Sequence, residues 1–220
     1  MSENGFQFAF QGASLVARAS GALWWPARRL LAVGDLHFGK AQRHARARAG
    51  GLLPPYEMRE TLCRLDAEIE ALDPAHVVAL GDSFDDPQAE ARMLEEDALW
   101  LDRLMAGRDW SWITGNHDPG PLSLGGGLRA ALTEAGITFR HIAEGPAEVS
   151  AHYHPKARLA GVSAPCFLID ADRVILPAFG SYTGGMECWR PPLVDLMGKG
   201  ALAVLTGRRA RALPMPRRKA

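Results

Sequence analysis

Short apolar runs recur along the first half of the chain. They predict strands at 30–33, 76–80 and 110–114, and the segment 6–25 also has the pattern of paired strands. The strand at 30–33 ends abruptly in polar residues, which is unexpected for a segment with the composition of a protein core.

Two helices are predicted between these strands. Apolar residues recur at intervals of three and four over 58–72 and again over 94–105, so that each set lies on one helical face. A third, shorter helix is expected at 128–132, after three consecutive glycines. Strands that alternate with helices in this way predict a layered α/β core.

The second half of the chain is richer in β-like segments. After about residue 137, short apolar pieces are joined by turns that contain Gly, Pro and Asp. A single domain over residues 1–220 accommodates both halves if two sheets pack together with helices outside. The end of the chain, about 207–220, is basic and contains prolines, and we expect a mobile tail there.

Composition narrows the class of protein. The 220 residues suffice for one well-buried domain, and 25 basic residues balance 25 acidic ones, so no overall field draws the molecule to a polyanion. Three scattered cysteines without a CxxC spacing argue against a disulfide framework and a thiolate zinc site. With no signal-peptide pattern and no apolar run of membrane length, we expect a cytoplasmic protein without membrane association.

Polar residues of metal-ligand type follow three of the predicted strands. Asp35 and His37 follow the strand at 30–33, and Asp82 and Asn116 follow the next two strands. Because sites in open α/β sheets form at the carboxyl ends of strands, neighbouring strands would bring these side chains to one edge.

Histidines further along complete the set. His141 lies on a β-like piece, and His152 and His154 are two positions apart, so that both can face one point. The candidate ligands are Asp35, His37, Asp82, Asn116, His141, His152 and His154. Mixed carboxylate, amide and imidazole donors suit Mn²⁺, Fe or Zn²⁺, and we expect Mn²⁺. Seven ligands are too many for one small ion and suit two that share a carboxylate.

The order and spacing of these motifs resemble the calcineurin-like metallophosphoesterases. Residues 31–155 contain D-x-H, G-D-x-x-D, G-N-H-D and H-x-H in the order of that superfamily. The resemblance implies a four-layer α/β/β/α sandwich, in which two mixed sheets pack together with helices outside. It implies these ligands for the two ions: Asp35, His37 and His154 for one, Asn116, His141 and His152 for the other, and Asp82 as the bridge.

The same resemblance implies catalytic roles. A metal-bridging hydroxide would attack the phosphorus, and His117 would be the general acid for the leaving oxygen, with Asp118 orienting its imidazole. Asp85 would support a ligand without binding metal. Ala151 stands where the superfamily usually has glycine, a departure that concerns backbone fit and removes no ligand.

Features outside the shared motifs resemble one family more closely. The segments DLHFGK, LGDSFDD and LPAFGSYTGG, the last at 176–185, are similar to the ligase-associated DNA damage response endonuclease (PdeM) family over nearly the whole chain. This resemblance implies hydrolysis of phosphodiester bonds in single-stranded or damaged DNA during repair. It also implies a DNA ligase, a helicase and an exonuclease as partners.

A basic run follows the first motif directly. It contains Lys40, Arg43, Arg46 and Arg48, which would lie near the rim of the site. Such a rim would attract a polyanion and contact its phosphates without reading sequence. The alternative is a solvated helix face with no binding role.

Two other classes of function stay open. A small-molecule phosphatase or cyclic nucleotide phosphodiesterase could use the same scaffold, and a deep closed pocket rather than an open basic groove would favour it. A binding scaffold that has lost catalysis should lack the general acid or a bridging ligand. Asp82, Asn116 and His117 are all present, which disfavours this last class.

Overall fold

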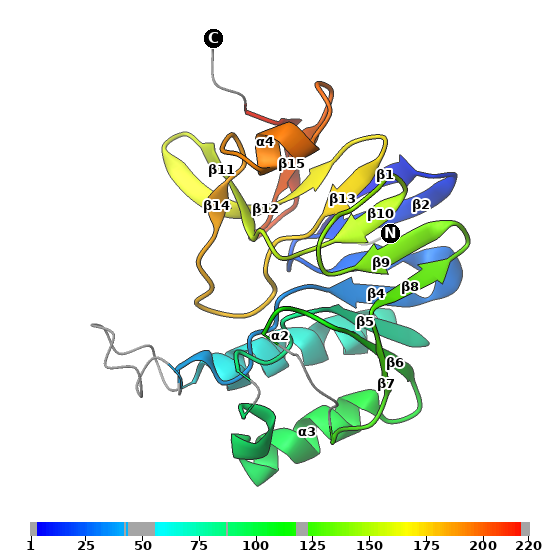
Figure 1. Ribbon diagram of the computed structural model, residues 1–220, viewed down its shortest axis with the longest axis vertical. Helices are drawn as coiled ribbons and strands as arrows, with labels where there is room; N and C mark the ends of the chain where they lie inside the picture. Colours follow the sequence, from blue (N-terminus) through cyan, green and yellow to red (C-terminus); the bar gives the residue numbers. More distant parts are fainter. Residues whose placement is uncertain (1–3, 42, 44–55, 87, 118–122, 217–220) are drawn as a thin grey trace.

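The computed structural model describes residues 4–41, 43, 56–86, 88–117 and 123–216. Two β-sheets pack against each other, and helices α2 (Glu57–Leu72) and α3 (Glu95–Met105) lie against the outer side of the first sheet (Figure 1). A short helix, α4 (Leu193–Leu196), packs on the outer side of the second sheet. Two single-turn 3₁₀ helices, η1 (Pro26–Arg28) and η2 (Glu90–Arg92), connect the elements.

The first sheet has its strands in chain order. They are β1 (Gly5–Phe10), β2 (Ala13–Arg18), β3 (Leu23–Trp25), β4 (Leu30–Val33), β5 (His76–Leu80), β6 (Asp109–Ile113) and β7 (Gly127–Arg129). Strands β1 to β4 pair antiparallel, and β4 to β7 pair parallel. The parallel half therefore carries the carboxyl ends of β4, β5 and β6 to one edge.

The second sheet mixes parallel and antiparallel pairs. Its strands are β8 (Ala131–Glu134), β9 (Ile137–Arg140), β10 (Glu148–Ser150), β11 (Pro155–Leu159), β12 (Val162–Ile169), β13 (Arg173–Ile175), β14 (Met186–Glu187), β15 (Leu202–Leu205) and β16 (Arg211–Pro214). They are ordered β14-β11-β12-β13-β10-β9-β8, with β15 paired to β12 and β16 to β15.

The side chains of the buried strands point alternately to the two faces of the first sheet, which explains why a layer packs on each face. Val78 and Leu80 of β5 pack with residues of the second sheet, whereas Val77 and Ala79 pack with α2 and α3. Successive side chains of a strand point to opposite faces, so a strand that is apolar throughout needs a partner layer on each side. The layers are those expected, α/β/β/α, with only the short α4 as the helical cover of the second sheet among the described residues.

One predicted helix is wrong. The two long helices begin and end within one residue of their predicted bounds, but the segment expected as a helix at 128–132 belongs to two strands, β7 and β8. Strand β7 pairs with β6, and β8 pairs with β9. A segment this short forms a helix poorly by itself, and pairing with two existing strands supplies its backbone with partners.

The basic tail also differs from the expectation. Arg211–Pro214 form β16, which pairs antiparallel with β15, and Met215 is buried in the apolar cluster beneath α4. This part of the tail is thus an edge strand, and 217–220 lie outside the described residues. None of the described helices is long and apolar enough to cross a membrane.

Candidate metal centre

The loops that leave β4 and β5 run side by side. Past the strand ends, the N–H groups of His37 and Phe38 donate to the carbonyls of Asp82 and Ser83, both at 2.9 Å. The N–H of Asp85 donates back to the carbonyl of Phe38 at 3.0 Å. This ladder continues the parallel pairing of β4 and β5, and so it fixes the D-x-H motif beside the G-D-x-x-D motif.

The backbone is strained in the loops that hold the predicted ligands. Five of the seven predicted ligands have a positive φ: Asp35 (52°), His37 (48°), Asp82 (46°), His152 (70°) and His154 (46°). For residues other than glycine such conformations are sparsely populated and cost on the order of 1–3 kcal/mol each. The surrounding hydrogen bonds must hold these conformations, which set the directions of the ligand side chains.

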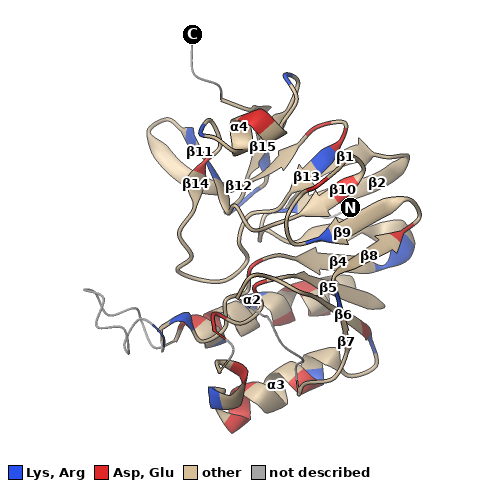
Figure 2. Ribbon diagram, viewed as in Figure 1, with Lys and Arg blue, Asp and Glu red and all other residues tan. Residues whose placement is uncertain are grey.

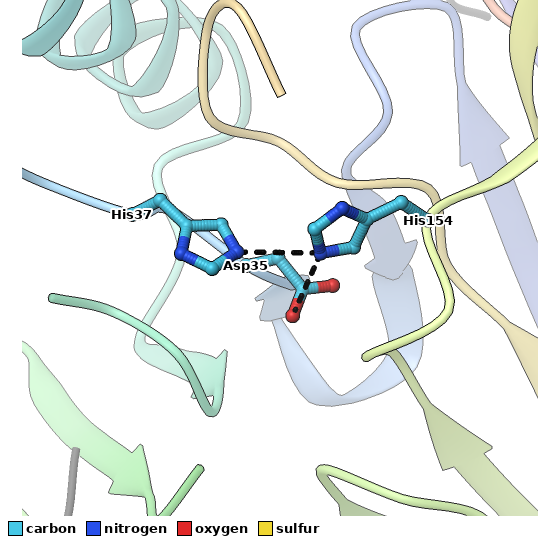
Figure 3. A group of neighbouring side chains, drawn as sticks. All are labelled: Asp35, His37 and His154. Carbon is cyan, nitrogen blue, oxygen red and sulfur yellow. Dashed lines mark hydrogen bonds and ion pairs between the residues drawn. The ribbon is translucent and has the colours of Figure 1, made fainter. Parts of the chain in front are cut away.

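The first group consists of Asp35, His37 and His154 (Figure 3). His154 Nε2 lies 3.3 Å from His37 Nε2 and 3.4 Å from Asp35 Oδ1. Two nitrogens bound to one tetrahedral ion at about 2.0–2.1 Å would be roughly 3.3 Å apart. Asp35 Oδ1 is also buried and has no hydrogen-bond partner in the described part of the chain. The nitrogen spacing and the unpartnered oxygen both fit a metal ion.

The second group consists of Asp82, His141 and His152, with Asn116 beside it. His141 Nε2 lies 3.0 Å from His152 Nδ1, 3.0 Å from Asn116 Oδ1 and 3.4 Å from Asp82 Oδ2. His141 Nδ1 lies 2.9 Å from the carbonyl of Leu80, which can only accept, so Nδ1 carries the proton. This contact leaves the lone pair of Nε2 to face the group, as a metal ligand requires.

Asp35 is in contact with both groups. Its Oδ2 accepts a hydrogen bond from the N–H of His152 at 2.9 Å, and its Oδ1 lies 3.8 Å from His141 Nδ1. Asp82 belongs to the second group, and its Oδ1 accepts the N–H of His117 at 2.8 Å. The bridging role that we expect for Asp82 stays a prediction.

Charges in the centre shift the pKa values of Asp82, His141 and His152 in different directions. Burial works against ionisation of Asp82, but His141 and the N–H of His117 outweigh it and lower the pKa of Asp82 to about 2. Burial also opposes the charged form of His141, yet the carboxylates of Asp82 and Asp35 raise its pKa. Burial and the charge of His141 lower the pKa of His152. Asp82 is therefore ionised and His152 neutral at pH 7, as metal binding requires. The raised pKa of His141 favours its protonated form, so an ion bound to Nε2 would have to displace that proton.

His117 lies beside the two groups and belongs to neither. Its ring centre is 5.4 Å from that of His37, and its Nδ1 lies 3.0 Å from the carbonyl oxygen of Asp85. Because a carbonyl only accepts, Nδ1 carries a proton and Nε2 is left for another partner. We expected Asp118 to orient this ring, but Asp118 lies outside the described residues. A backbone carbonyl carries no signal in the sequence, so this contact could not be predicted.

Ala151 packs against the first motif. A side-chain Cβ built on Gly34 would lie 2.5 Å from the Cβ of Ala151, which is itself fully buried. The N–H of Ala151 donates to the carbonyl of His141 at 3.0 Å. An alanine therefore fits at 151 because the residue opposite it has no side chain.

Gly34→Ala is expected to destabilise the protein and weaken metal binding, since it pushes the Asp35 loop away from Ala151. Overpacking of this kind costs about 1–3 kcal/mol in the free energy of unfolding. Ala151→Gly added to Gly34→Ala should recover most of that loss, because the two Cβ atoms compete for one space. Denaturant unfolding of the two single variants and the double variant measures the free energy of unfolding that is lost and recovered. A double variant as unstable as the sum of both singles would contradict this packing.

The segment 178–186 forms backbone hydrogen bonds both with the loop that holds Asp35 and with the loop that holds His154. The N–H groups of Phe179, Gly180 and Met186 donate to carbonyls in the loops that hold Asp35 and His154, at 2.8, 3.0 and 3.1 Å. A Cβ on Gly180 would lie 2.2 Å from a carbonyl oxygen of the Asp35 loop. The sequence singled out the segment 176–185 without giving it a role. The glycines of this segment were the feature of the sequence that could have indicated its role, because close contacts between backbones need residues without a side chain.

The basic run is only partly described. Arg46 and Arg48 lie outside the described residues, and Lys40 is half-buried, with a pKa lowered by burial. Arg43 forms an ion pair with Asp85. Asp85 Oδ1 also lies 3.1 Å from His37 Nδ1, and its role in supporting that ligand stays a prediction. Elsewhere, basic and acidic residues are mixed over both sheets and the helices (Figure 2).

The two packed mixed sheets and the two Asp/His groups beside the carboxyl ends of β4 and β5 define the class of this protein together with a solved structure of the same fold. The chain is a calcineurin-like metallophosphoesterase. It superimposes on the crystal structure of nuclease MPE from Pseudomonas putida with a TM-score of 0.78 and 29% identity, covering 96% of this chain and all of the other.

A curated relative is similar to part of the chain. The chain is 29% identical over 161 residues to the DNA double-strand break repair protein Mre11 of Haloferax volcanii. The match covers 70% of this chain and 34% of that protein, so the chain spans about a third of its relative's length. No family model matches the chain.

Proposed function

We propose that the protein is a metal-dependent DNA endonuclease that acts in DNA repair. The observation that carries the proposal is the pair of Asp/His groups set in a fold that matches a nuclease over its full length. The partial similarity to a DNA double-strand break repair protein also favours DNA as the substrate. We further propose that residues 1–220 act as one domain, in the cytoplasm.

The residues present fit two divalent ions. Asp35, His37 and His154 would hold one, and Asp82, Asn116, His141 and His152 the other. Bound ions would neutralise charge on the phosphoryl oxygens and make water a nucleophile at neutral pH. Mixed carboxylate, amide and imidazole ligands suit Mn²⁺, Fe or Zn²⁺, and of these we propose Mn²⁺.

His117 is proposed as the general acid. The leaving alkoxide of a phosphodiester needs a proton, and an imidazole is the usual donor near neutral pH. Its Nδ1 is engaged by the carbonyl of Asp85, which leaves Nε2 as the nitrogen that exchanges the proton. Lys40 is proposed to contact the phosphates of the substrate, and a DNA ligase, a helicase and an exonuclease are the proposed partners.

Circular single-stranded DNA tests the proposed function, because a circle has no ends for an exonuclease. With MnCl₂ the protein should convert circles to linear strands, and removal of metal by EDTA should stop this. His154→Asn, purified in the same way, controls for contaminating nucleases. If metal-loaded protein hydrolyses a cyclic nucleotide but leaves circles intact, the small-molecule alternative is correct.

A further inference from the structure

Arg43 contacts the metal centre through Asp85. The N–H of Arg43 donates to the carbonyl of Gly39 at 3.1 Å, so one helical turn after the first motif brings the side chain back to Asp85. There the guanidinium Nε donates to Asp85 Oδ2. The side chain is 42% exposed, while that of Asp85 is fully buried.

Asp85 has a partner on each oxygen. Its Oδ1 lies 3.1 Å from His37 Nδ1, and neither of these two atoms has another hydrogen-bond partner in the part of the chain described. The contact turns His37 so that Nε2 faces His154 and Asp35. A buried carboxylate that lost its cation would be left undercompensated, which is costly in a protein interior.

We infer that Arg43 is a positioning residue for the first metal group, acting through Asp85 on His37. This inference rests on the proposed metal-dependent function, and it gives Arg43 a role other than the phosphate contact suggested by its place in a basic run. Without Arg43, Oδ2 of Asp85 loses its cation, and the carboxylate that contacts His37 Nδ1 is held less firmly in the direction that aims Nε2. Partners that orient a ligand in this way typically contribute 10–100-fold to metal affinity.

The test is a calorimetric titration of metal-free protein with MnCl₂. Arg43→Gln should weaken one of the two binding events by about 10–100-fold and leave the other unchanged. Arg43→Lys, which keeps a cationic donor, should recover part of the loss. Arg103→Gln removes an exposed arginine that pairs with Asp66 on α2, and it should titrate like the wild type.

A double-mutant cycle shows whether Arg43 acts through Asp85. Asp85→Asn should cause a similar loss, and Arg43→Gln combined with Asp85→Asn should be no worse than the more affected single variant. Additive losses would overturn the inference. Thermal unfolding of each variant shows that the fold is retained, and Arg43→Lys supplies the comparison if Arg43→Gln does not fold.

DNA cleavage separates this role from phosphate binding. With metal at saturation, the KM of Arg43→Gln for DNA and its salt dependence should match the wild type. An unchanged metal titration with a raised KM and a flatter salt dependence would instead make Arg43 a phosphate contact. The titration needs no DNA cleavage, so wild-type protein that binds two ions but cuts no DNA would refute the proposed substrate and not the inference.

Discussion

In His154→Asn and in His152→Asn, hydrolysis is expected to fall to background on every phosphoester. Each ring supplies a nitrogen that lies within 3.3 Å of another ring nitrogen of its group, so each loss removes a ligand from one ion. Metal analysis after dialysis against MnCl₂ should show fewer than two ions per chain. DNA and bis-p-nitrophenyl phosphate should be affected alike.

His117→Asn is the matched comparison, because it makes the same substitution at a histidine that lies beside the two groups and belongs to neither. It should keep both ions and slow DNA cleavage by about a hundredfold to ten-thousandfold, the usual scale for general acid–base catalysis. The loss should be much smaller with bis-p-nitrophenyl phosphate, whose leaving group departs without a proton. Loss of metal in His117→Asn, or equal slowing on both substrates, would contradict the role given to His117.

Asp35→Asn is expected to impair both ions at once. Asp35 Oδ1 faces His154 and lies 3.8 Å from His141, and Oδ2 accepts the N–H of His152. The change removes negative charge from a fully buried group that contacts both sets of ligands. We expect the affinity of both ions to fall by more than the roughly 10–100-fold that an outer partner contributes.

Asp82→Asn tests the bridging role in the same experiment. If Asp82 bridges, both binding events should weaken and activity should be lost. If Asp82 serves only the group in which it lies, one binding event should remain as in the wild type. Titration of the two variants side by side, with circular dichroism to check the fold, separates these outcomes.

The candidate ligands could be predicted because the sequence indicates where the apolar strands end and which side chains follow them. An apolar strand followed by Gly34-Asp35 or Gly81-Asp82 places a carboxylate at a sheet edge, and the structure brings both carboxylates to histidines. His141 had the weakest signal, a single histidine on a β-like piece. Its place was settled by long-range packing, which sets its Nδ1 against the carbonyl of Leu80.

The backbone contacts of the site could not be predicted from the sequence. The positive φ angles of Asp35 and His154, and the hydrogen bonds that the loop 178–186 donates to their loops, depend on atoms that every residue has. The strands at 127–129 and 131–134 were missed for a related reason, since pairing with distant strands decided their conformation. The pairing of Arg43 with Asp85 likewise joins residues 42 positions apart.

Anomalous X-ray scattering from crystals grown with MnCl₂ tests the central claim most directly. Two peaks are predicted, one among Asp35, His37 and His154 and the other among Asp82, Asn116, His141 and His152. A single peak, or peaks away from these side chains, would contradict a two-metal centre built from the two groups.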